Sequence, residues 1–526
     1  MATIFDLPAE IIDGILLQLP GQSVQVLRAT CRRLNQAASP FLFPVLYLSC
    51  HQLDLDVFRL VAANDLLLSG VRELVIDDTT LAPSLTDWKV FQAAASYTEG
   101  LWPKRRAPYF PGDPSFDVPG REWTPKPDKT LHELFMSVFK RHHHNRRTLA
   151  DVSALMGALP RMEALRSLVL SNRTADDAPA SGAQSQDSSS PTVRMWRRFG
   201  EKRKERPPFP PCCDWSLAGR SPHSRSYESI LGWDWLDDEL ERDIQESYAD
   251  EDESIVQQDP GVGFDEFDNT DSGNDLQYPE ERSIAHEGRG LFVALKALED
   301  PRVQSQLREF RVDASYDTIH GSCQPGVPIR LFDRNSPFPD RFGTQLALTP
   351  NLTRLHIVVN EECIPWERGD AVEKGRLGHV LGTMPQLEEL VFEAHGMAIL
   401  AAIPDDLTFK RLRRLEFSCG HIDPETLVGF LRRHAPTLES LRIEYCSIHP
   451  GRETYEWRDV VRDLTALQKR ATTKLKEIVL LSVFGFKPFV GCGKNGSIRI
   501  GRRDNQVYSW TYGVDKSLVQ AKRKDE

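Results

Sequence analysis

Residues 7–48 read LPAEIIDGILLQLPGQSVQVLRATCRRLNQAASPFLFPVLYL, and they decide how the first part of the chain folds. Apolar side chains at Ile11, Ile12, Ile15, Leu16 and Leu19 recur at helical spacing, and the polar residues between them are left for solvent. This spacing predicts an amphipathic helix that begins just after the Leu-Pro pair at the start of the stretch.

Two prolines and a capping residue set the expected boundaries of this helix. Pro8 suits the first turn, where its missing N–H costs nothing, and Asp6 is placed to cap the helix. Pro20 and Gly21 end it, and a second helix is expected to begin near Ser23. A third helix follows before the chain leaves the stretch. A unit of about 45 residues buries little apolar surface by itself, so we expect it to lean on the rest of the chain or on a partner.

The stretch resembles the F-box, a module that docks substrate receptors onto the Skp-type adaptor of cullin–RING ubiquitin ligases. Leu34 departs from the family, since many members have Trp there. The resemblance rests on Leu7, Pro8, Glu10, Ile11, Ile15, Leu16, Leu19, Pro20, Leu27, Cys31, Arg32, Arg33, Leu34, Asn35 and the exit from Phe41 to Leu48.

The resemblance implies that this stretch contacts the adaptor, and through the adaptor a cullin scaffold. Some of the residues involved must instead face the F-box's own core. The alternative is a small helical cap with no partner, and exposure of Leu16 and Leu19 would favour the docking interpretation. The implied adaptor-binding residues are Leu7, Pro8, Ile11, Ile15, Leu16, Leu19 and Pro20.

Six nine-residue strings in the second half of the chain share one apolar frame. Each has apolar residues at its first, fourth and sixth positions, and helical runs precede several of them. The pattern predicts a strand on one face and a returning helix on the other. The strings are LREFRVDAS (307–315), LTRLHIVVN (352–360), LEELVFEAH (387–395), LRRLEFSCG (412–420), LESLRIEYC (438–446) and LKEIVLLSV (475–483).

These strings resemble leucine-rich repeats, in which the ninth position is often Asn or Cys. Asn360 and Cys446 match that position, whereas the other four strings do not. The intervals are irregular, so insertions are expected between the repeats. The alternative is an ordinary α/β domain with leucine-rich strands. Farther along, residues 497–500 and 507–512 alternate with period two and predict a hairpin that closes the end of the repeats.

Residues 172–287 interrupt the pattern with a Ser-rich piece, a basic run at 194–206 and an acidic block at 234–281. The acidic block carries a local charge of −18, so the rest of the chain is +7 although the whole is −11. Such a composition predicts a largely disordered insertion, with one amphipathic helix at 230–248. The basic run is equally compatible with nuclear import and with a solvated linker; nucleic-acid binding is the less favoured interpretation.

No catalytic, cofactor or metal motif is expected. Residues 491–496 match GxGxxG, but a strand follows where dinucleotide binding needs a helix. Cys212 and Cys213 lack zinc-site spacing. His142, His143 and His144 are neighbours that point in different directions, and they are expected to form a solvated helix end. The prediction is therefore a protein that is not an enzyme and has no cofactor.

Composition limits where the protein works. The sequence has no run of 18 apolar residues and no secretory signal pattern, so no membrane association is expected. Nine scattered cysteines fit reduced thiols in the cytoplasm or the nucleus.

Together these patterns predict an α/β chain with a three-helix F-box and an irregular leucine-rich-repeat solenoid, or horseshoe. The expected function is recruitment of a protein substrate, which the sequence does not identify, to an SCF-type (Skp–cullin–F-box) ubiquitin ligase. The alternative is a leucine-rich-repeat interaction scaffold that acts outside such a ligase. The expected divisions are 1–50 (F-box), 51–171 (helical linker and first repeat-like units), 172–287 (insertion), 288–484 (repeats) and 485–526 (hairpin cap and charged tail).

Overall fold

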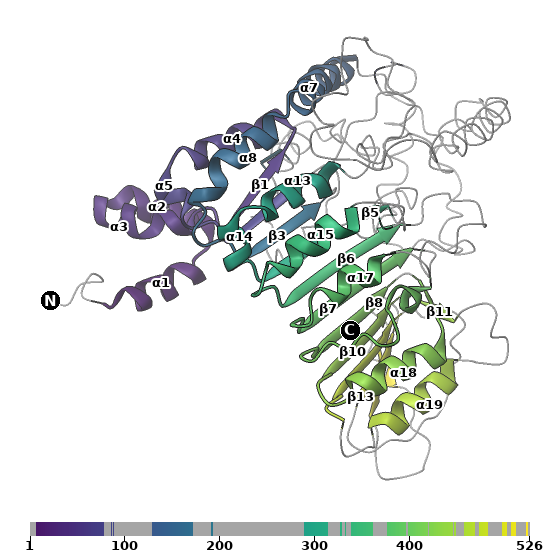
Figure 1. Ribbon diagram of the computed structural model, residues 1–526. Helices are drawn as coiled ribbons and strands as arrows, with labels where there is room; N and C mark the ends of the chain where they lie inside the picture. The colour runs from purple at the N-terminus through teal and green to yellow at the C-terminus, as the bar shows by residue number, and fades with distance from the viewer. Residues whose placement is uncertain are drawn as a thin grey trace. The chain divides into compact units, whose positions relative to one another are not determined.

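Figure 1 shows a computed structural model of the chain, which falls into two compact units. Unit 1 comprises Met1–Ala82, Asp128–Cys213 and Arg289–Asp313, and unit 2 comprises Pro83–Pro127, Asp214–Gly288 and Ala314–Glu526. The structure describes residues 7–77, 86, 88, 129–171, 191–192, 289–313, 327–328, 332, 338–360, 376–395, 398–418, 420–444, 446–448, 457–468, 473–481, 497–501, 507–511 and 522–523.

Unit 1 begins with the three short helices that the sequence predicts. They are α1 (Ala9–Gln18), α2 (Gly21–Thr30) and α3 (Arg32–Ala38), followed by the 3-10 turn η2 (Ser39–Phe41). Pro8 and Pro20 are the N-caps of the first two helices, and neither helix start has a side-chain cap. The expected cap, Asp6, lies outside the described residues. The second helix begins two residues earlier than expected, because the Pro20 carbonyl already accepts the Ser23 N–H at 2.9 Å.

Four parallel strands form the sheet of unit 1, in the order β1 (Val45–Ser49), β2 (Glu73–Asp77), β3 (Ser167–Ser171) and β4 (Glu309–Asp313). Leu46, Leu74, Leu168 and Phe310 lie at one register position and are buried. The sequence itself predicts strands at 71–76 and 165–170, and the structure confirms both within one or two residues. The helices of this unit are α4 (Gln52–Ala62), α5 (Asp65–Leu68), α7 (Lys129–Arg147), α8 (Ala150–Ala158), η6 (Leu159–Arg161), α13 (Arg289–Leu298) and α14 (Pro301–Gln306).

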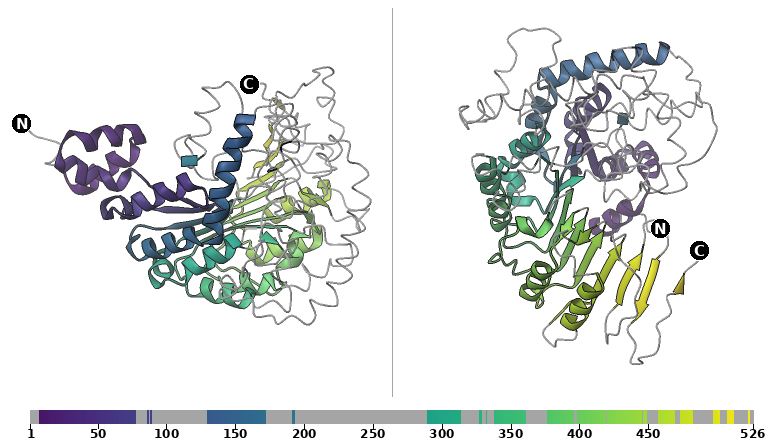
Figure 2. Two further views of the ribbon diagram at one scale, coloured as in Figure 1. Left: turned by 90° about the horizontal axis from the view of Figure 1, so that it is seen from above. Right: turned by 90° about the vertical axis from the view of Figure 1, so that its right-hand side faces the viewer.

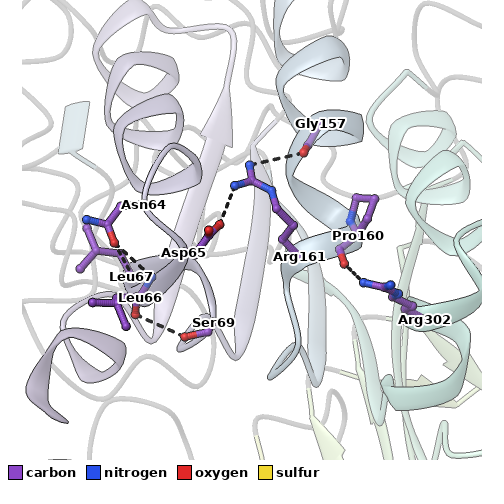
Figure 3. Close-up of polar contacts among 9 residues, drawn as sticks. All are labelled: Asn64, Asp65, Leu66, Leu67, Ser69, Gly157, Pro160, Arg161 and Arg302. Atoms are coloured by element: carbon purple, nitrogen blue, oxygen red, sulfur yellow. Dashed lines mark hydrogen bonds and ion pairs between the residues drawn. The ribbon is translucent and has the colours of Figure 1, made fainter. Parts of the chain in front are cut away.

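The apolar spacing at 57–68 predicts a single amphipathic helix, but this stretch contains the end of α4 and the whole of α5. The side chain of Asn64 accepts the backbone N–H groups of Leu66 and Leu67, at 3.1 and 3.3 Å, so it caps a new helix (Figure 3). An Asn at such a position competes for backbone donors, which explains why the apolar periodicity alone did not reveal the break.

Unit 2 repeats the helix-then-strand order. Its main sheet runs β6 (Arg354–Asn360), β7 (Glu389–His395), β8 (Arg414–Ser418), β10 (Ser440–Glu444), β12 (Glu477–Leu481) and β13 (Ser497–Gly501), all parallel. Two antiparallel strands follow, β14 (Val507–Thr511) and β15 (Lys522–Arg523), while β5 (Val327–Pro328) pairs with β6. The remaining elements are α15 (Phe338–Ala347), α17 (Leu377–Gly382), η11 (Ile399–Ala402), β9 (His421–Ile422), α18 (Pro424–His434), β11 (Ser447–Ile448) and α19 (Trp457–Gln468).

All six nine-residue strings contain strands, five of them in unit 2 and one as β4 of unit 1. The fourth-position residues Leu355, Leu390, Leu415, Leu441 and Ile478 share one register position and are buried. The α-helices of unit 2 lie on one face of its strands (Figures 1 and 2). The expected α/β class is thus confirmed, as is the antiparallel pairing of the hairpin at 497–511.

The described residues correct one prediction about the three histidines. They do not follow a helix but lie inside α7, which continues to Arg147. His143 and His144 are exposed, as expected, but His142 is buried and its ring lies 4.7 Å from the ring of His51. One side of α7 is buried at every third or fourth residue, namely at Phe135, Phe139, His142 and Asn145, so His142 lies on the buried side.

Several predictions concern residues that the structure leaves undescribed. These are a helix that the sequence favours at 84–100, apart from two isolated residues, the insertion at 172–287 apart from residues 191–192, its helix at 230–248, the cysteine pair at 212–213 and the glycine-rich stretch at 491–496. The strand β13 begins directly after that stretch.

Candidate functional site

Several large apolar side chains of the first three helices are exposed, and three of them lie on α1 or just before it. Ile11 and Ile15 stand four residues apart on one side of the helix, and Leu7 directly precedes its N-cap, Pro8. The exposed fractions of Leu7, Ile11 and Ile15 are 40%, 51% and 39%. We call these three residues the α1 stripe. Apolar side chains left exposed in a row are typical of a surface that another protein covers.

The neighbouring side of α1 packs within the three-helix unit. Leu16 is buried in a small core with Val24 and Ala38, and Ile12 and Leu19 pack against it. Leu16 and Leu19 are therefore held by the helices' own core and are not fully exposed. Of the seven residues that the F-box resemblance singles out, Leu7, Pro8, Ile11, Ile15 and Pro20 are exposed, Leu19 is half-buried and Leu16 is buried.

A glycine lies beside the stripe. Gly14 stands in the middle of α1, and a Cβ built on it would meet no atom within 4 Å. Glycine within a helix costs about 1 kcal/mol relative to alanine. Because nothing within the described chain requires a missing side chain here, the helix offers a bare strip of backbone next to Ile11 and Ile15.

The three helices are joined closely to the sheet of unit 1. The N–H groups of Arg72 and Glu73 both donate to the carbonyl of Pro44, at 2.9 and 3.0 Å. A Cβ on Gly70 would overlap the backbone carbonyl of Pro40, so only glycine allows this approach. The Pro44 bonds pair the entries of β1 and β2, while η2, the turn that follows the third helix, packs closely against the residues that lead into β2.

A second candidate surface lies on the strand face of unit 2 that its α-helices leave uncovered. Arg354 and Arg414 flank the carboxylate of Glu389, with N···O distances of 3.7 and 3.9 Å. Farther along, Arg442 pairs with Glu416 at 3.4 Å and with Glu444 at 2.8 Å. Charged side chains thus form a row across four neighbouring strands, and we call it the charged strand face.

Glu416 is the most perturbed carboxyl group on this face. Burial, with added repulsion from the carboxylates of Glu444, Glu393 and Glu389, raises the pKa of Glu416 to about 6, although Arg442 opposes the shift. Its side chain is still 32% exposed. A carboxyl group with this pKa changes charge near neutral pH, so binding to this face can depend on pH.

The described residues offer little for catalysis. Within them, no group of three or more His, Cys, Asp or Glu residues is arranged to hold a metal ion. Burial raises the pKa of Cys446 to about 12, which leaves its thiol protonated and unreactive. Burial also lowers the pKa of His51 to about 4, so its ring stays neutral. None of the helices in these residues has the length and apolar character needed to cross a membrane.

The two surfaces differ in how visible they were in the sequence. The α1 stripe was contained in the F-box pattern, but the pattern did not separate its residues from those of the core. The charged strand face was missed, although its signal was present at the third and fifth positions of the nine-residue strings, between the apolar residues. No protein-family model matches this sequence, and comparison with curated proteins finds no match either.

Proposed function

We propose that this protein is a non-catalytic substrate receptor of an SCF-type ubiquitin ligase. The first three helices would act as an F-box whose α1 stripe docks on a Skp-type adaptor, and the charged strand face would contribute to binding a protein substrate. The observation that carries the proposal is the α1 stripe: three exposed apolar residues on a unit whose own core is very small.

The repeat pattern of unit 2 supports the receptor part of the proposal. The carbonyl of Glu388 accepts hydrogen bonds from two N–H groups at the start of the next strand, at 2.8 and 3.0 Å. The same pair of hydrogen bonds recurs at the carbonyls of Arg413 and Glu439. Cys446, at the ninth position of its string, is buried with its Sγ 3.3 Å from the Glu444 carbonyl and 3.7 Å from the Phe417 carbonyl. A ninth-position side chain that satisfies backbone groups is what the resemblance to leucine-rich repeats implies.

In this proposal the mechanism is proximity. A receptor that holds a substrate lysine near a charged ubiquitin-conjugating enzyme raises the effective concentration of the lysine. No residue of this chain would then take part in bond making or breaking. The binding surfaces and the distance between them would determine the rate.

The test uses the bare position on α1. Gly14→Gln adds a long side chain beside the stripe without entering the core, so the variant should fold but lose binding to a purified Skp-type adaptor. The matched control is Gly157→Gln, since Gly157 is also a helical glycine with no atom within 4 Å of its Cβ position. If the wild-type chain retains no adaptor in a co-purification, the ubiquitin-ligase proposal is wrong.

A second candidate is an interaction scaffold in which the first three helices only shield one end of the sheet. One observation favours it: Leu16 is buried and Leu19 half-buried within the three-helix core. The two candidates predict opposite results in the same experiment, because a scaffold would not bind the adaptor at all.

A further inference from the structure

Three arginines occupy the same structural position on neighbouring strands of unit 1. Arg72, Arg166 and Arg308 each stand one residue before their strands β2, β3 and β4. The Arg166 N–H donates to the Arg72 carbonyl at 2.8 Å, and the Arg308 N–H donates to the Arg166 carbonyl at 2.8 Å. The backbone of Arg166 therefore lies one strand spacing, about 4.8 Å, from that of Arg72 on one side and from that of Arg308 on the other. We call these residues the arginine rim.

The equivalent position in unit 2 has a different charge pattern. There the residues are the uncharged Thr353 and then Glu388, Arg413, Glu439 and Lys476, which alternate in sign. The Lys476 Nζ lies 3.4 Å from a carboxylate oxygen of Glu439, so side chains at this position reach one another across strands. Like charges placed opposite each other destabilise a sheet. The arginine rim therefore carries a repulsion that the rest of the protein avoids at the same position.

The described carboxylates do not neutralise the rim. The Arg72 guanidinium lies 5.7 Å from the centre of the Phe41 ring, and Arg166 donates to the Leu165 carbonyl and to the Gln306 side-chain oxygen. Neither contact brings a negative charge, and Arg308 is exposed. Within the described residues, no ion pair involves any of the three.

Two further arginines, Arg161 at the end of η6 and Arg302 in α14, precede the rim residues in the chain, and Figure 3 shows their contacts. Arg161 pairs with Asp65 at 2.8 Å, and Arg302 donates to the Pro160 carbonyl. Both residues are exposed and precede rim residues by five and six positions. Arg161 is neutralised by Asp65, whereas the contact of Arg302 with a carbonyl brings no negative charge, so Arg302 adds positive charge beside the rim.

We propose that the arginine rim is a docking surface for an acidic segment of a protein partner. Guanidinium groups bind carboxylates through paired hydrogen bonds, and an extended peptide that carries several Glu or Asp side chains would offset the mutual repulsion of the rim. The proposal does not depend on the function proposed above, since neither the α1 stripe nor the charged strand face contributes to it.

An acidic peptide fits the site better than a nucleic acid does. A long polyphosphate would need a broad basic face along which several of its phosphates could lie. Two carboxylates, Glu73 and Glu309, directly follow Arg72 and Arg308 in the sequence, and both pair with Arg311. The positive surface is therefore a short row and not a broad basic face.

The test measures binding of a fluorescent peptide of about eight glutamates to the full-length protein by fluorescence polarisation. We compare Arg72→Gln/Arg308→Gln with Arg413→Gln/Lys476→Gln, which removes the same charge from the same position of unit 2. The first variant should bind about tenfold more weakly, the loss expected for two exposed ionic contacts, and the second should stay within about twofold of wild type. Wild-type binding should also weaken between about 50 and 300 mM salt.

Three outcomes would overturn the proposal. If the wild-type protein does not bind the peptide, the proposal is wrong. If both double variants weaken peptide binding equally, the effect comes from net charge and not from the rim. A single-stranded oligonucleotide of similar length that binds more tightly through the same arginines would replace the acidic peptide with a nucleic acid. Because Arg72→Gln also loses the Phe41 contact, the single variant Arg308→Gln is measured as well; it should show part of the loss with an unchanged melting temperature.

Discussion

The double variant Ile11→Ser/Ile15→Ser tests whether the α1 stripe is a docking surface. Both side chains lie outside the small core formed by Leu16, Val24 and Ala38, so the change removes apolar surface from solvent contact and leaves the packing intact. Serine and isoleucine have similar helix propensities, and the free energy of unfolding should change by no more than about 0.5 kcal/mol.

The expected loss of binding follows from the exposed fractions. Burying a whole isoleucine or leucine side chain contributes about 1.5–3 kcal/mol. Ile11 and Ile15 still expose 51% and 39%, so covering what remains contributes about 0.6–1.5 kcal/mol for each. The double variant should therefore lose about 1–3 kcal/mol of binding free energy, which raises the dissociation constant roughly 5- to 150-fold.

Isothermal titration of the purified Skp-type adaptor into each variant gives the dissociation constant directly. The matched control is Leu60→Ser/Leu348→Ser, which removes two apolar side chains that are 70% and 53% exposed but lie elsewhere on the protein. The control should bind like wild type. Equal dissociation constants for wild type and Ile11→Ser/Ile15→Ser would refute the assignment of docking to the stripe, whatever else the protein binds.

Two further predictions concern stability. Gly70→Ala should lower the melting temperature by several degrees in a thermal scan, because its Cβ would overlap the Pro40 carbonyl. Gly157→Ala, where the Cβ meets no atom, should instead raise the free energy of unfolding by about 1 kcal/mol. Equal effects of the two variants would contradict the close approach of Gly70 to Pro40. Because the pKa of Glu416 is raised to about 6 in the folded state, the native protein holds the extra proton between about pH 4.5 and 6, and stability falls as pH rises through that window. Glu416→Gln should reduce this loss of stability, which is measured by chemical denaturation at several pH values. The control Glu425→Gln, at an exposed residue, should leave the loss unchanged. The effect of Glu416→Gln stays below about 2 kcal/mol, since the Glu416 side chain is 32% exposed.

Much of the fold could be predicted because local pattern and burial agree. The six nine-residue strings place apolar residues where a strand buries them, and each string contains a strand of a parallel sheet. Helix ends were less predictable. The break at Asn64 depends on a side chain that caps a new helix, and apolar spacing does not register that competition.

The candidate surfaces could be predicted only in part. The α1 pattern identifies an amphipathic helix, but its apolar residues cover more than one face. Only the packing of Leu16 against Val24 shows which of those faces is the core. The arginine rim depends on Arg72, Arg166 and Arg308, which are up to 236 residues apart in the chain and become neighbours through strand pairing alone. Sequence patterns within a window cannot reveal such a row.

The close junction between the first three helices and the sheet bears on the proposed mechanism. A receptor that works by proximity gains most when its adaptor and its substrate are held at a fixed separation, since a flexible connection dilutes the effective concentration. The backbone of Gly70 lies against Pro40 in η2, the turn that follows the third helix, so the three-helix unit packs against the entry to β2. Loosening this junction by Gly70→Ala should therefore leave the affinity for the adaptor nearly unchanged while slowing substrate ubiquitination. For a scaffold that acts outside a ligase, Gly70→Ala is not expected to separate the affinity for the adaptor from the rate of substrate ubiquitination.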